Sequence, residues 1–115
     1  MVVGEMVQEV DIAVIGGGPG GYTAALRCAE LGLKTILVDA APKPGGVCLH
    51  MGCIPSKSLL HAAEVINEAK HAEKIGITFG APKIDVKALR EWKQSVLDKL
   101  ASGIVGMCKS AGVEM

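Results

Sequence analysis

The sequence predicts an α/β fold in which parallel strands are joined by a helix, with two further helices downstream to make three. Three observations carry this prediction. An apolar, β-branched run ends at residue 15, a glycine-rich turn follows it, and a second short apolar run spans 34–39. Strand, helix and strand within about 30 residues make a βαβ unit, whose crossover is right-handed in nearly all proteins.

The elements follow in order along the chain. Residues 8–15, QEVDIAVI, are predicted to form the first buried strand. Residues 20–31 carry small and helix-favouring side chains, and Gly32 is typical of a helix stop. Residues 34–39, KTILVD, form the second buried strand. After the PKPGG turn, a second helix is expected over about 54–72.

A third helix is expected over about 86–110, with Asp85 as its N-cap. One face of it carries apolar residues every three or four positions, namely Leu89, Trp92, Val96, Leu100, Ile104 and Met107. Residues 75–84 are an irregular link, and the final AGVEM looks like the start of a third strand. Two parallel strands do not make a stable sheet, so we expect residues 1–115 to be the first part of an incomplete domain.

Composition excludes several classes of function. The chain has 12 basic and 12 acidic residues, without the basic excess of a nucleic-acid binder. Residues 1–11 lack the apolar core of an export signal, and Ile12 to Leu26 is too short and glycine-rich to span a bilayer. A soluble cytoplasmic protein is expected, and in that compartment disulfides are usually catalytic or redox-sensing. Half of the residues are hydrophobic, which hints at a piece of something larger.

The glycine-rich turn fits the pattern G-x-G-x-x-G at Gly16, Gly18 and Gly21. It lies between a predicted strand and a predicted helix, and Asp39 ends the next strand, as the dinucleotide-binding fingerprint of Rossmann-like folds requires. Gly16 would make the tight turn, Gly18 would let backbone approach a pyrophosphate, and Gly21 would let the helix pack on the strand. Asp39 can accept hydrogen bonds from a ribose. The pattern does not separate FAD from NAD, and a glycine turn that binds nothing is the alternative.

Two cysteines, Cys48 and Cys53, lie in the segment GGVCLHMGCIPSK at residues 45–57. In a regular helix, Cα atoms five residues apart would be about 8–9 Å from each other, whereas a disulfide needs less than about 7 Å. A bridge would therefore require a break in the helix. The glycines of the segment, Gly45, Gly46 and Gly52, supply the necessary backbone freedom.

Pro55 fits only the first turn of a helix, so the second helix should begin near Cys53. A thiolate at that position is stabilised by the helix dipole and by Lys57, one turn further on. Cys48, on the loop side, is expected to be the accessible sulfur.

Three interpretations of the pair remain open on these grounds. It can be a redox disulfide next to a flavin, a metal site formed by Cys48, His50 and Cys53, or two unlinked buried thiols. The metal site lacks a fourth ligand and the usual C-x2-C spacing. The other two cysteines, Cys28 and Cys108, are expected to be small core residues.

The segment 45–57 resembles the redox-active segment of the pyridine nucleotide–disulfide oxidoreductases, and the likeness extends from about residue 8 to 113. GCIPSK followed by SLLHAAEVI is most similar to the lipoamide dehydrogenase branch of that family. Glutathione and mercuric reductases usually have valine where Ile54 stands. The resemblance implies an FAD-binding domain. Its expected cofactor-binding residues are Gly16, Gly18, Gly21, Asp39, Gly46, Val47, Cys48 and Lys57.

The resemblance also implies catalytic roles. Cys48 would be the thiol that exchanges with dihydrolipoamide, and Cys53 the thiol against the flavin, with Lys57 near flavin N5. A substrate thiolate would attack Cys48, and electrons would pass from the reduced pair through FAD to NAD⁺. His50 stands where the family usually has asparagine, and Met51 where it has valine. A histidine there could titrate near neutral pH, but the substitution is interpreted as a tolerated loop variant.

The family is several times longer than this chain. Its NAD-binding domain and C-terminal dimerisation domain would lie elsewhere, as would its base, a histidine paired with glutamate, which His50, His61 and His71 do not match. The isolated chain is therefore expected to be inactive. The intact enzyme would be a homodimer that uses NAD, without a metal, and would serve lipoyl domains of 2-oxo acid dehydrogenase or glycine cleavage complexes. The alternatives are a mercuric or glutathione reductase-like enzyme, a stand-alone flavin- or thiol-binding module, and a metal-binding interaction domain.

Overall fold

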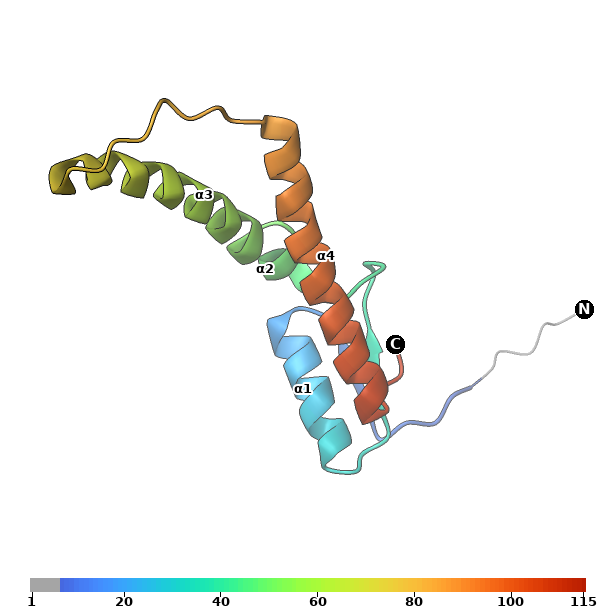
Figure 1. Ribbon diagram of the computed structural model, residues 1–115. Coiled ribbons are helices and arrows are strands. Elements are labelled where there is room, and N and C mark those ends of the chain that lie inside the picture. Colours follow the sequence, from blue (N-terminus) through green and yellow to red (C-terminus); the bar gives the residue numbers. More distant parts are fainter. Residues whose placement is uncertain (1–6) are drawn as a thin grey trace, which may run out of the picture.

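The computed structural model describes residues 7–115, so the first part of the N-terminal segment discussed above, residues 1–6, lies outside it. Two short strands and three long helices occur in the predicted order, and a five-residue helix and a 3-10 turn were not predicted (Figure 1). The elements are β1 Ile12–Ile15, α1 Pro19–Glu30, β2 Thr35–Val38, α2 Gly46–His50, α3 Cys53–His71, η1 Ala72–Ile75 and α4 Val86–Ala111. The α/β prediction with parallel strands is confirmed.

The sheet is parallel and is centred on β2. β1 pairs with β2 in a register that places Ile12 opposite Thr35. On the other side of β2, Glu114 forms a parallel bridge with Ile36. The N–H of Leu37 donates to the Glu114 carbonyl at 2.7 Å, and the N–H of Glu114 donates to the Thr35 carbonyl at 3.1 Å. The predicted third strand therefore begins where expected.

The first strand is shorter than predicted, because it starts at Ile12 rather than at residue 8. Asp11 marks the boundary. Its N–H donates to the Lys34 carbonyl at 2.8 Å, and its carboxylate accepts the N–H of Lys34 at 2.7 Å. These two hydrogen bonds join the N-terminal ends of β1 and β2. Residues 7–10 lie outside the sheet.

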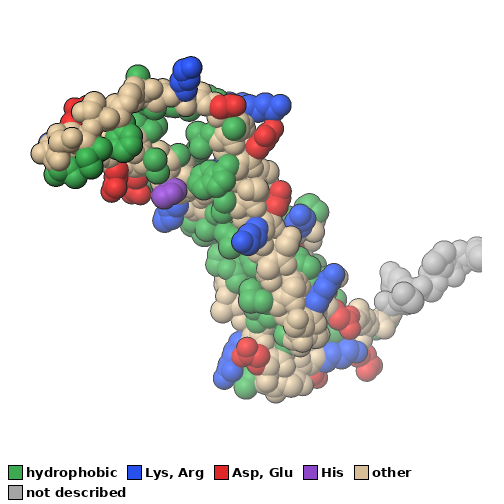
Figure 2. Space-filling model, in the orientation of Figure 1, with side chains coloured by type: hydrophobic (Ala, Val, Ile, Leu, Met, Phe, Trp, Pro, Cys, Tyr) green, Lys and Arg blue, Asp and Glu red, His purple; other side chains and the backbone are tan. Residues whose placement is uncertain are grey.

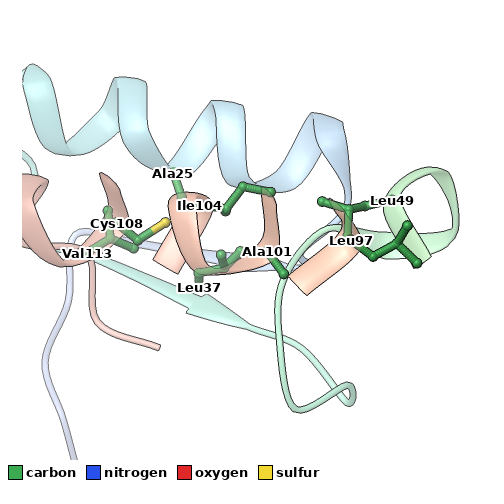
Figure 3. Packing of buried hydrophobic residues seen from close by; sticks show 8 residues of the cluster. All are labelled: Ala25, Leu37, Leu49, Leu97, Ala101, Ile104, Cys108 and Val113. Carbon is green, nitrogen blue, oxygen red and sulfur yellow. The ribbon is translucent and has the colours of Figure 1, made fainter. Parts of the chain in front are cut away.

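The core lies on one face of the sheet, under α1 and α4. Figure 3 shows Ala25 of α1 pointing toward Ile104 of α4, and at one end of the cluster Leu49 of α2 lies beside Leu97 of α4. The cluster consists of Ala25, Leu37, Leu49, Leu97, Ala101, Ile104, Cys108 and Val113. The opposite face carries Ile15 and Val38, which are 86% and 47% exposed among the described residues. The prediction that both strands are buried is therefore wrong for this face, since both covering helices lie on the other one.

The long helix α4 begins and ends as the sequence predicts. The Asp85 carboxylate accepts the N–H of Ala88 at 3.0 Å, which is an N-cap. The helix continues through Gly103 and Gly106 and ends before Gly112, whose φ of +79° is the left-handed conformation of a helix stop.

The buried face of α4 is rotated from the predicted apolar stripe. Its buried residues are Leu97, Ala101, Ile104 and Cys108, whereas Leu100 and Met107 are about half exposed. Small side chains at 101 and 108 let α4 approach its neighbours closely, so this side forms the contact. Cys108 is a small core residue as predicted, and Cys28 is half-buried in α1.

The far ends of α3 and α4 form an arm that projects from the sheet, with residues 76–85 crossing between their tips (Figure 1). Ser58 is the buried residue of α3, while its apolar residues Leu59, Leu60 and Val65 are exposed. Figure 2 shows hydrophobic side chains along the arm and down α4, interspersed with basic and acidic ones. Within residues 7–115, no helix combines the length and apolar character needed to cross a membrane.

Candidate active site

The glycine turn between β1 and α1 has the geometry that its sequence predicts. Gly16 has a φ of +101°, which favours glycine. A side chain at Gly21 would overlap the carbonyl oxygen of Gly16, so α1 packs directly on the end of β1. Gly18 is the extended N-cap residue of α1, and no side chain among residues 7–115 caps that end. The first N–H groups of α1 are therefore available to an anion.

Asp39 lies beside this turn, just after β2. Its Oδ2 accepts the N–H of Gly17, and its Oδ1 accepts the N–H of Ala41 at 2.8 Å. The bonds from Ala41 and then from Gly17 lower the pKa of the carboxyl below its ordinary value. The carboxylate thus joins the glycine turn to the end of β2, and each oxygen keeps a lone pair for a further donor such as a ribose hydroxyl.

We expect the Asp39 carboxyl to titrate below its ordinary pKa of 3.8 in the folded protein. Because the pKa of Asp39 is lower in the folded state than in the unfolded state, its carboxylate stabilises the fold fully at pH values above the unfolded-state pKa. This contribution is lost as the pH falls through the folded-state pKa. Carboxyl ¹³C NMR titration measures the midpoint directly. In Asp39→Asn, this part of the acid dependence of unfolding should vanish. A midpoint at or above 3.8 would contradict the two hydrogen bonds.

The start of the cysteine segment packs against the glycine turn. The N–H of Gly45 donates to the Gly17 carbonyl at 2.7 Å. A side chain at Gly46, whose φ is +62°, would come within 2.7 Å of the Gly18 Cα. The structure therefore brings together two segments of the predicted cofactor site, and Val47 follows on the exposed surface of α2.

Cys48 and Cys53 form a disulfide, with their Cα atoms 4.7 Å apart. As predicted, no regular helix spans them, because α2 ends at His50 and α3 begins at Cys53. The break falls at Met51 and Gly52. The interpretation as unlinked thiols is therefore wrong.

The metal interpretation is also contradicted. The two sulfurs are bonded to each other, and the His50 ring nitrogen Nε2 lies 3.1 Å from the Pro44 carbonyl oxygen instead of joining them. Among residues 7–115, no group of three or more histidine, cysteine or acidic residues is arranged to hold a metal ion.

The exposure of the two cysteines is the reverse of the prediction. Cys53 is exposed at the start of α3, with exposed Lys57 one turn further on, whereas Cys48 is half-buried. Cys48 is less exposed because it lies on the side of α2 that faces α4. It borders a cavity between them.

This cavity has a volume of about 490 Å³, within the range of small-molecule sites. Most of its lining is apolar, with one cation, Lys99, and the residues beside Cys48 include Tyr22, Leu49, Ile54, Leu100, Ile104 and Met107. Sequence reasoning missed this site. The signal was present in the apolar stripe of α4, whose members Leu100 and Met107 line the cavity instead of the core.

Comparison with known proteins agrees with this arrangement. The family described as "Pyridine nucleotide-disulphide oxidoreductase" matches residues 10–115. Among curated proteins, the chain is 51% identical over 104 residues to "Dihydrolipoyl dehydrogenase" of Buchnera aphidicola subsp. Acyrthosiphon pisum, which covers 90% of the chain and 22% of that relative. The same name is carried by relatives from Haemophilus influenzae, 51% identical over 91% of the chain and 22% of the relative, and Bacillus subtilis, 47% identical over 100% and 24%. The chain thus spans less than a quarter of the length of these relatives.

Proposed function

Because the chain belongs to the pyridine nucleotide–disulphide oxidoreductase family, we propose that it is the FAD-binding and redox-disulfide segment of a dihydrolipoyl dehydrogenase. The observation that carries the proposal is the Cys48–Cys53 disulfide, which joins α2 to the start of α3, with α2 beginning directly beside the glycine turn. The names of the relatives support the assignment to this branch. The cytoplasm is the proposed site of action, and a disulfide there would be catalytic or redox-sensing and not a structural staple.

The residues around the glycine turn fit FAD. The first turn of α1, with Gly16, Gly18 and Gly21, would hold the pyrophosphate, and Asp39 would accept from the adenosine ribose. Gly46, Val47 and Lys57 would lie along the rest of the cofactor, toward the disulfide. When bound, FAD would supply the redox chemistry that carries two electrons from the cysteine pair to NAD⁺. Cys53, exposed at the start of α3, would be the sulfur next to the flavin, as the family resemblance implies.

The disulfide would react by thiol exchange in two steps. A thiolate of dihydrolipoamide attacks the Cys48 sulfur from the cavity, the S–S bond breaks, and Cys53 leaves as a thiolate at the start of α3. The second substrate thiolate then attacks the substrate sulfur of the mixed disulfide and releases Cys48. The substrate dithiol becomes a cyclic disulfide, and the protein disulfide becomes two thiols, so two electrons pass to the protein.

The cavity favours an aliphatic dithiol as the substrate. Its lining beside Cys48 is largely apolar and carries one cation, which suits a lipoyl chain better than the charged tripeptide glutathione. The partners we propose are lipoyl domains of 2-oxo acid dehydrogenase or glycine cleavage complexes, with a homodimer as the complete enzyme.

Dihydrolipoamide should reduce the Cys48–Cys53 pair in the complete protein that carries this sequence. After brief incubation with dihydrolipoamide or glutathione, alkylation and peptide mass spectrometry count the free thiols at each cysteine. We expect new alkylation at Cys48 and Cys53 with dihydrolipoamide only, while Cys28 and Cys108 serve as internal controls. A stronger response to glutathione would point to a glutathione reductase-like enzyme, and no response to either thiol would overturn the proposal.

A further inference from the structure

His50 is the last residue of α2 and faces away from the cavity beside Cys48. The residue is half-buried, and its ring nitrogen Nε2 lies 3.1 Å from the Pro44 carbonyl oxygen. A side chain on Gly45 would come within 3.1 Å of the same nitrogen, so the ring packs directly on this turn. His50 borders a different hollow, together with Asp39 and Lys43. It therefore contacts the backbone before α2 while Cys48 projects from the opposite side.

The helix that carries Cys48 needs such contacts. α2 has five residues, and a helix this short is not stable by itself in water. Among the described residues, its start is held by the Gly45 N–H bond to the Gly17 carbonyl, and its fourth residue, Leu49, is buried in the core. Its last turn is held by the disulfide to Cys53 and by the His50 ring.

Reduction of the disulfide removes one of the contacts that hold α2. Once the bond between Cys48 and Cys53 opens, the covalent anchor of α2 is lost. The last turn of the helix is then held by buried Leu49, which packs on Gly45, and by the hydrogen bond from His50 to Pro44, the one polar side-chain contact of α2 to the preceding loop among the described residues.

We propose that His50 is a positioning residue for the redox pair: together with buried Leu49, its ring N–H keeps the last turn of α2 folded while the disulfide is open, so that the sulfur of Cys48 stays within reach of Cys53. The inference rests on the proposed function of the pair. If Cys48 becomes mobile when the disulfide is reduced, the effective concentration of its thiol near Cys53 falls. The disulfide then re-forms less readily, and the equilibrium shifts toward the dithiol. Loss of the His50 contact should therefore make the disulfide easier to reduce.

The test compares His50→Leu with His50→Gln, whose amide nitrogen can occupy the position of the ring Nε2. The Cys48–Cys53 equilibrium is measured in the complete protein against a dithiothreitol redox buffer, with alkylation as readout. His50→Leu should shift it toward the dithiol by about tenfold, the scale of one hydrogen bond, or about 30 mV for two electrons. His50→Gln should stay within about twofold of the wild type by the same scale. His61→Leu, at an exposed histidine of α3, is the matched control.

Hydrogen exchange gives a second readout that does not depend on the equilibrium constant. The N–H of Met51 donates to the Val47 carbonyl at 2.9 Å across the last turn of α2. In His50→Leu, exchange of this amide should accelerate in the reduced protein and stay unchanged in the oxidised one. Equal equilibrium constants and exchange rates in His50→Leu and the wild type would overturn the inference.

The wild type alone also tests the inference, should His50→Leu fail to fold. Its Met51 amide should remain protected after reduction, and loss of that protection would mean that His50 does not hold the helix. The two proposals fail separately. If dihydrolipoamide does not reduce the wild-type pair, the proposed function falls, whereas the dithiothreitol equilibrium reports on His50 in either case.

Discussion

Cys48→Ser should abolish dihydrolipoamide oxidation in the complete protein while leaving flavin bound. Serine cannot form the mixed disulfide, so the loss should exceed about 10⁴-fold, the scale seen when an enzyme loses its nucleophile. Flavin should remain because the proposed cofactor contacts centre on the glycine turn, and the Cys48 side chain borders the cavity under α4. Turnover is followed with dihydrolipoamide and NAD⁺, and bound flavin by its visible absorbance after gel filtration.

Cys28→Ser is the matched control, since Cys28 is a free thiol of α1 outside the site. It should keep both turnover and flavin. The opposite pattern in Cys48→Ser, with flavin lost and thiol turnover retained, would show that Cys48 serves the cofactor site and not the exchange reaction.

Gly21→Ala should disrupt both the fold and the cofactor site. The new methyl group would overlap the Gly16 carbonyl oxygen and lie 2.8 Å from the carbonyl carbon. Both atoms belong to the backbone, so no change of rotamer relieves the clash, and α1 must move off β1. We expect a loss of about 3 kcal/mol in the free energy of unfolding, at the upper end of the range for overpacking. Urea denaturation measures it, and flavin content after purification reports on the site.

Gly20→Ala separates this clash from the general effect of adding a methyl group to α1. A side chain at Gly20 would meet nothing within 4 Å. Alanine is a better helix former than glycine, so this variant should be unchanged or stabilised by up to about 1 kcal/mol. If Gly21→Ala proved as stable as Gly20→Ala, the close packing of α1 on Gly16 would not hold in solution.

The sequence predicts the glycine turn well because its constraints are local. Gly16 needs a left-handed φ, Gly21 needs the absence of a side chain, and both requirements can be read from residue type and spacing. The break between Cys48 and Cys53 was predictable for the same reason, since a disulfide and a regular helix exclude each other over five residues.

Features that depend on packing between distant segments were not predictable in this way. The rotated face of α4 depends on how closely Ala101 and Cys108 let the helix approach its neighbours. The relative exposure of the two cysteines depends on α4 lying over Cys48 and leaving Cys53 open. Periodicity within one helix contains neither piece of information, because an apolar stripe can face a core or a cavity equally well.

The bridge between Ile36 and Glu114 has a consequence for the order of folding. β1 and β2 pair across a short crossover, so their contact can form early. The bridge at Glu114 closes a much longer loop that includes α2, α3 and α4, and the entropy of loop closure grows with loop length. We infer that the segment around Glu114 docks on β2 late, after α4 has formed. During synthesis, the paired cysteines would then come together before the sheet that supports them is complete.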